Sequence, residues 1–108
     1  MANTFKLKTK ANVGLTTSNV YVVPSSTTTV VIGVTLANTS GSGINVAIGI
    51  TRASTDDVSV MKNVPIPRGS SLEFMSGNKV VLEATDSLTA YSDVNNTLDV
   101  ALTIMEIT

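Results

Sequence analysis

Residues 64–88, VPIPRGSSLEFMSGNKVVLEATDSL, hold two of the three prolines and two of the seven glycines of this 108-residue chain. Pro65 and Pro67 each fix φ and remove a backbone donor, so this piece is expected to form a corner or an exposed edge and not the interior of a sheet. Apolar residues then alternate with polar ones on both sides of residues 76–79, SGNK, which predict a tight turn. The stretch therefore indicates two short strands in a hairpin-like arrangement.

Alternation with a period of two continues outward in both directions, and no long window has the apolar spacing of a helix. Thr, Ser and Val dominate, as is typical of pleated, half-buried surfaces. The alternating segments outside the opening stretch are residues 5–13, 19–23, 28–37, 44–51, 58–64 and 98–108. With turn signals about every 8–12 residues, they predict an all-β fold, an antiparallel β-sandwich or jelly roll of about eight to nine short strands.

The chain length predicts a single β-sandwich domain over residues 1–108, with a short N-terminal arm at about residues 1–4. We expect residues 28–37 and 44–51 to form a hairpin across the loop at 38–43. The final alternating segment runs to the last residue, which predicts that the C-terminus is tied into a sheet.

Residues 5–13 alternate between apolar positions and lysines. Phe5 and Leu7 are expected on the buried face, with Lys6, Lys8 and Lys10 on the wet face. Such lysines discourage unwanted pairing of an edge strand, or they contact an acidic partner surface. Residues 28–37 and 98–107 are apolar on both faces, which predicts a subunit interface in addition to the core.

The composition excludes several classes of chemistry. The chain has no cysteine, histidine or tryptophan, and its net charge is −1. It therefore offers no thiolate ligand or nucleophile, no imidazole base, and no basic patch for nucleic acid or anionic lipid. No apolar run reaches the length of a membrane span or of a signal peptide, which predicts assembly in the cytoplasm.

The acidic residues do not suggest a catalytic site. A pair of carboxylates for glycoside hydrolysis would need aromatic platforms for the sugar, and only 4% of the chain is aromatic. Residues 93–96 have the composition of part of a calcium loop but lack its glycine and its distal glutamate. We therefore expect no catalytic, cofactor or metal site and no enzyme. A sugar- or receptor-binding module would likewise call for loop aromatics that the chain mostly lacks.

The segment VPIPRGSSLEFMSGNKVVLEATDSL and the ending LDVALTIMEIT, at residues 98–108, resemble small structural proteins of tailed bacteriophages, including phages of cyanobacteria. The similarity extends to residues 21–24 and 36–40 and so covers most of the chain. Arg68 stands where the pattern has a small residue, and Thr85 where it has glycine.

This resemblance implies a virion component, assembled in the host cytoplasm, and within that class a capsid decoration (cement) protein. The alternative is a tail, baseplate or fibre-associated structural or receptor-binding component. The implied partner is the major capsid protein, together with further copies of the chain, for which a trimer is one symmetry. Several weak patches on one rigid body give tight attachment. The candidate contact residues are Lys6, Lys8, Lys10, Pro65, Pro67 and Arg68.

Overall fold

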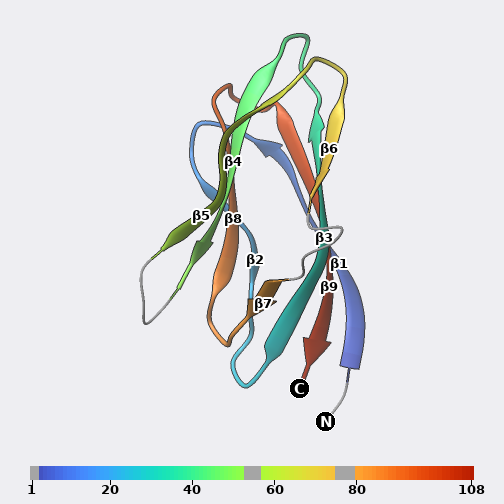
Figure 1. The fold of residues 1–108 in the computed structure, drawn as a ribbon, viewed down its shortest axis with the longest axis vertical. Helices are drawn as coiled ribbons and strands as arrows, with labels where there is room; N and C mark the ends of the chain where they lie inside the picture. The colour runs from blue at the N-terminus through green and yellow to red at the C-terminus, as the bar shows by residue number, and fades with distance from the viewer. Residues whose placement is uncertain (1–2, 53–56, 75–79) are drawn as a thin grey trace.

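The computed structural model describes residues 3–52, 57–74 and 80–108. These ranges contain nine β-strands and no helix, and every pair of neighbouring strands is antiparallel (Figure 1). The strands are β1 (Asn3–Val13), β2 (Ser18–Val22), β3 (Thr28–Asn38), β4 (Ile44–Thr51), β5 (Val58–Ile66), β6 (Ser71–Phe74), β7 (Val80–Leu82), β8 (Ser87–Ser92) and β9 (Leu98–Ile107). The predicted all-β sandwich is confirmed.

The strands form two sheets. A five-stranded sheet has the order β1-β9-β3-β6, with β7 also paired to β3, and a four-stranded sheet has the order β2-β8-β4-β5. β9 lies between β1 and β3, so the last strand is held on both edges, as the sequence predicted. No helix that could cross a membrane occurs within the part of the chain described by the structure.

The topology is that of one long antiparallel ribbon wound into a sandwich. Each strand of the first half pairs with its counterpart in the second half, and the sum of the two residue numbers stays almost constant along the ribbon. The pairs include Asn3 with Ile107, Ser18 with Ala90, Val34 with Phe74, and Ile44 with Ile66. A double sheet wound in this way is a jelly roll.

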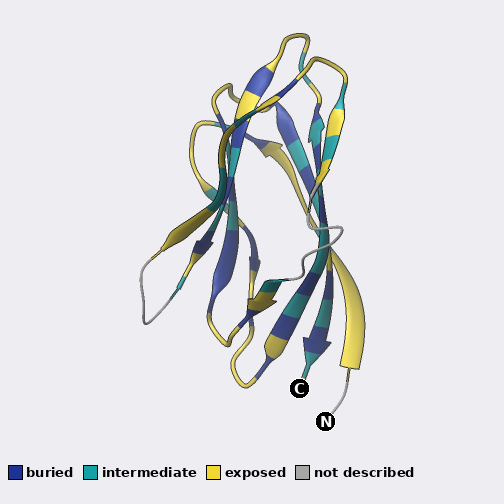
Figure 2. Ribbon diagram, viewed as in Figure 1, coloured by how far each residue is buried: buried dark blue, intermediate teal, exposed yellow. Residues whose placement is uncertain are grey.

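The core lies between the sheets (Figure 2). In β9 the inward side chains of Leu98, Val100, Leu102 and Ile104 are at most 2% exposed. Leu36 of β3 packs from the same sheet, and residues such as Ile48 of β4 and Leu88 of β8 close the core from the other. Burying a row of branched aliphatic side chains from both sheets is the main stabilising contribution to this fold.

The predicted hairpin of residues 28–37 with 44–51 is wrong. β3 belongs to the five-stranded sheet and β4 to the four-stranded sheet, so the loop between them crosses from one layer to the other. Asn38 secures this crossing, because its buried amide nitrogen lies 2.9 Å from the Ser42 carbonyl oxygen and 3.0 Å from that of Ile66. Alternation sets the faces of a strand, but it does not choose the strand's partner.

The hairpin-like arrangement expected within residues 64–88 is also wrong, because β6 and β7, on either side of the predicted turn, pair with β3 and not with each other. β6 pairs with residues 34–37 of β3 and β7 with residues 29–31, both antiparallel, so β6 and β7 run in the same direction along one edge. The tight turn predicted at residues 76–79 lies outside the described residues. The prolines do lie at an edge, since Pro65 is in the outermost strand β5, and the chain turns at residues 67–70.

β1 corrects a third expectation. Phe5 and Leu7, predicted to be buried, are 70% and 65% exposed, whereas the lysines lie on the face that continues the inward row of β9. β1 is an edge strand, and only Val13 at its end is buried. Asn3 and Thr4, which fall within the expected short N-terminal arm, pair with β9.

Candidate partner-contact surfaces

Lys6 is committed to a polar network inside its own chain. Its Nζ lies 2.7 Å from Oε1 of Glu106, a β9 residue that is 5% exposed. The Tyr21 hydroxyl, on β2, donates to the other carboxylate oxygen of Glu106 and lies 2.9 Å from Oγ1 of Thr29. The network joins both sheets at one end of the sandwich, and it keeps a buried carboxylate paired.

The electrostatics of this network follow from its contacts. The hydrogen bonds from Lys6 and then from Tyr21 lower the pKa of Glu106 below its ordinary value of 4.5. Burial, reinforced by the hydrogen bond to Glu106, raises the pKa of Tyr21 to about 12. At neutral pH the carboxylate is therefore charged and the phenol is protonated, which is the combination that the hydrogen bond requires.

The other two lysines of the predicted stripe are progressively less engaged. Nζ of Lys8 lies 5.9 Å from the centre of the Tyr21 ring, near the outer limit of a cation–π contact. Lys10 is exposed. The predicted stripe therefore divides into an inner part that stabilises β1 and an outer residue available to a partner.

The corner at residues 65–70 is well defined. Pro65, in β5, lies opposite Asn45 of β4. Pro67 and Arg68 are exposed. Gly69 has a φ of 69°, a conformation that side chains disfavour, and the Ser70 amide donates to the Pro67 carbonyl at 3.2 Å. The corner thus holds Arg68 at the surface on a short, hydrogen-bonded turn.

The six predicted contact residues do not form one patch. The molecule measures 45 × 25 × 22 Å, and Figure 1 places the start of β1 and the β5–β6 connection toward opposite ends. Among the three lysines of β1, Lys10 lies nearest to the corner, since it is in register with Leu72 across β9 and β3. Three strand spacings put the backbones of Lys10 and Leu72 about 14 Å apart. Lys6 lies farther along β1, away from the corner.

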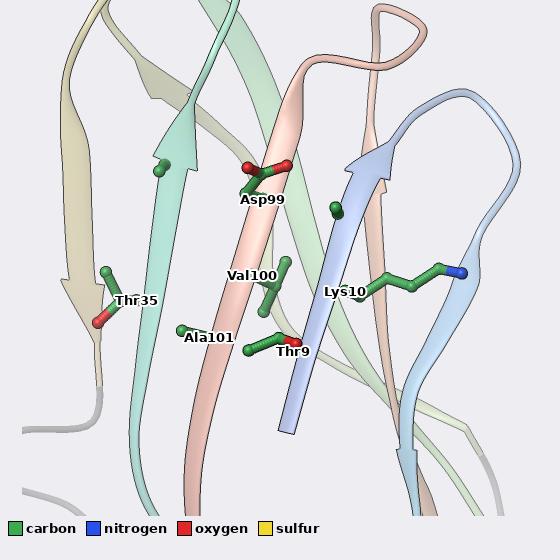
Figure 3. A pocket seen from close by; sticks show the side chains of 8 residues that line it. Thr9, Lys10, Thr35, Asp99, Val100 and Ala101 are labelled. Carbon is green, nitrogen blue, oxygen red and sulfur yellow. The ribbon is translucent and has the colours of Figure 1, made fainter. Parts of the chain in front are cut away.

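A shallow hollow of about 230 Å³ lies over the outer face of β1, β9 and β3, lined by Thr9, Lys10, Ala11, Thr35, Ala37, Asp99, Val100 and Ala101 (Figure 3). It exists because most of its outward side chains are small. Lys10 extends away from the other labelled side chains, and Asp99 accepts a hydrogen bond from the Asn12 amide at 3.0 Å. Lys10 and Asp99 are the ionisable residues of its lining, and their side chains do not converge.

An ion cluster at the end of β4 was not predicted from the sequence. Arg52 pairs with Glu83, and its Nε lies 3.2 Å from Asp86, which is 4% exposed. Asp86 also accepts from the Glu83 amide at 3.0 Å. Each charge here has a partner in its own chain, which indicates a structural clamp on the β7–β8 turn.

No protein-family model matches the chain, and no curated protein matches it in sequence. Solved structures match its fold over nearly the whole length. A chain of the disulfide-linked pili that form Bacillus endospore appendages has a TM-score of 0.60 at 15% identity, covering 99% of this chain and 87% of its own. A chain of the acid-stable capsid of Helicobacter pylori bacteriophage KHP30 has a TM-score of 0.57 at 14% identity, covering 100% of this chain and 94% of its own.

A weaker match is a pentameric capsid protein isolated from metagenomic phage sequences, with a TM-score of 0.43 at 20% identity. It covers 92% of this chain but only 59% of its own. The two stronger matches show that this fold also occurs in a chain of a phage capsid and in a chain of a pilus.

Proposed function

We propose that the chain is a bacteriophage virion structural protein, and specifically a capsid decoration (cement) protein that binds the shell between capsid subunits and stabilises it. The observation that carries the proposal is the match to the KHP30 capsid chain, which spans all of this chain and 94% of the other. The resemblance of residues 64–88 and 98–108 to phage structural proteins supports the same class. The proposal includes the virion as location, the major capsid protein as partner and no enzymatic activity.

The structure suggests which residues contact the shell. Lys6 and Lys8 are engaged within the chain, so the exposed Arg68, on its hydrogen-bonded corner, and the exposed Lys10 are the better candidates. A rigid cationic corner can meet an acidic surface on the shell without ordering a loop on binding. Pro65 and Pro67 hold the corner in shape, because their φ angles are fixed.

The test is co-sedimentation of the purified chain with shells assembled from the major capsid protein of the same genome. Arg68→Glu should weaken binding by about tenfold or more, because it reverses a charge at the contact. Lys62→Glu, on the exposed side of β5, is the matched control and should bind like the parent chain. Failure of the parent chain to sediment with shells would refute the decoration role. Equal binding of both variants would exclude only the corner at residues 65–70 as the contact site.

The alternative is a tail, baseplate or fibre-associated component, and the match to a pilus chain favours it, because a pilus is an elongated assembly. This chain has no cysteine of its own to form disulfide links of the kind that the pilus has. Cryo-electron microscopy of the intact particle separates the two roles. Density for this fold between capsid subunits supports decoration, and density confined to the tail supports the alternative.

A further inference from the structure

The outer face of the five-stranded sheet carries a continuous apolar row. Phe5 of β1 lies opposite Met105 of β9, Met105 opposite Val30 of β3, and Val30 opposite Val81 of β7. Phe5 is 70% exposed and Val81 58% exposed, while Met105 and Val30 are half-buried. We define this row, together with the neighbouring Leu7 and Ile107, as the outer apolar face.

This face is unlike ordinary exposed surface. Cross-strand neighbours lie about 5 Å apart, so the four residues of the row lie side by side on four neighbouring strands. Single exposed apolar residues need no explanation, but a contiguous apolar patch on a sheet marks a surface that another molecule covers. None of its six residues is charged, and the lysines of β1 point to the opposite side of the sheet.

We propose that the outer apolar face is covered by the same face of a second copy, giving a two-fold dimer in which the two five-stranded sheets stack. The inference goes beyond the decoration role and stands independently of it. The charge distribution favours this occupant. An uncharged row is complementary to itself, and the chain's net charge of −1 leaves little repulsion between copies.

The outer side of the sheet offers more contact area than the six residues alone. The strands β1, β9 and β3 each have at least ten residues, and β6 with β7 adds a fourth row. With about 3.3 Å per residue and about 4.8 Å between strands, the flat projection of the whole outer side is about 600 Å². The outer apolar face is one part of it, and Asp99 and Glu73 lie on the rest. Side-chain relief adds to that value, so a dimer that used the whole outer side would approach the roughly 800 Å² per partner of a stable specific interface. Facing sheets pack about 10 Å apart, so the two rows would interdigitate as the layers of a core do.

The experiment is sedimentation equilibrium of the purified chain from micromolar to near-millimolar concentration, together with light scattering. The parent chain should reach twice the mass of the 11.2 kDa chain. Phe5→Glu with Leu7→Glu should raise the dimer dissociation constant by at least about 100-fold, because each substitution acts on both copies. Val81→Glu, on β7, should also weaken the dimer. This result would show that the effect of the Phe5 and Leu7 substitutions is not a local disruption of β1.

The matched control is Leu15→Glu with Val22→Glu. These residues are 54% and 51% exposed, lie outside the outer apolar face and change the net charge by the same amount, so this variant should dimerise like the parent. Circular dichroism should show the same β content in all variants. A parent chain that stays monomeric, a trimer, or a dimer that the face variants leave intact would each overturn the proposal. If the parent is monomeric and the face variants no longer bind shells, the outer apolar face contacts the capsid instead.

Discussion

β1 and β9 lie side by side and have similarly alternating sequences, yet they bury different residues. The inward side chains of β9 are aliphatic and at most 2% exposed, whereas β1 directs lysines inward and leaves Phe5 and Leu7 on the outside. β9 is flanked by strands on both edges and faces the opposite sheet, while β1 is the last strand of its sheet. Alternation divides a strand into two faces, and its place in the sheet decides which face is covered.

The largest expected difference between the two strands is in how much the free energy of unfolding falls when a leucine is truncated to alanine. Leu102→Ala should lower the free energy of unfolding by about 2–5 kcal/mol, because it opens a cavity at a fully buried site. Leu7→Ala should change it by no more than about 0.5 kcal/mol. Urea denaturation below the concentration of self-association measures both values. Similar losses for the two variants would show that β1 is as deeply packed as β9.

The next effect concerns the lysines of β1. Lys6→Met should cost about 1–2 kcal/mol, since it leaves the buried Glu106 carboxylate without its cation, and the partial exposure of Lys6 limits the loss. Lys10→Met is the control at an exposed position of the same strand, and thermal denaturation should place it within about 0.5 kcal/mol of the parent. Equal effects would mean that the network does not hold β1.

Acid should weaken the same end of the molecule. The pKa of Glu106 is lowered in the folded chain, so its contribution to stability is complete above the ordinary value of 4.5 and is lost as the pH falls through the lowered pKa. Glu106→Gln has no such group and should lose less stability over that range. Denaturation curves recorded from neutral to acidic pH compare the two, and parallel losses would contradict the assignment.

Of the two lysines that contact groups within the chain, the smaller effect is expected at Lys8. Its ammonium group lies 5.9 Å from the Tyr21 ring centre, so Lys8→Met should cost about 0.5 kcal/mol, between the effects at Lys6 and Lys10. A double-mutant cycle with Tyr21→Phe checks whether the ring contact or the hydroxyl network is responsible. A coupling energy of zero between Lys8 and Tyr21 would show that the cation–π contact does not contribute to stability.

Strand positions were largely predictable because each strand carries its own alternation. Residues 44–51 were predicted as a strand, and β4 has those bounds. Pairing was not predictable in the same way. The partners of β3 lie in β9, β6 and β7, far along the chain, and no local pattern distinguishes them from the adjacent β4.

The contact residues were harder to predict for the same reason. A run of lysines on an alternating strand has the same appearance whether the lysines face water or a buried acid, and Glu106 is 100 residues away from Lys6. Thr85 is an instructive exception. The resemblance marks its position as one for glycine, and its φ of 70° is the left-handed conformation that glycine adopts most easily.

The wound ribbon has a consequence for how the chain acquires its structure. The β4–β5 pair closes the shortest loop, whereas β1 meets β9 only when both ends of the chain come together. Contacts that close long loops form late and slow the reaction. During synthesis, β1 has no strand partner until β9 has been made, so Phe5 and Leu7 lie next to an unpaired backbone edge while all the strands between β1 and β9 are synthesised.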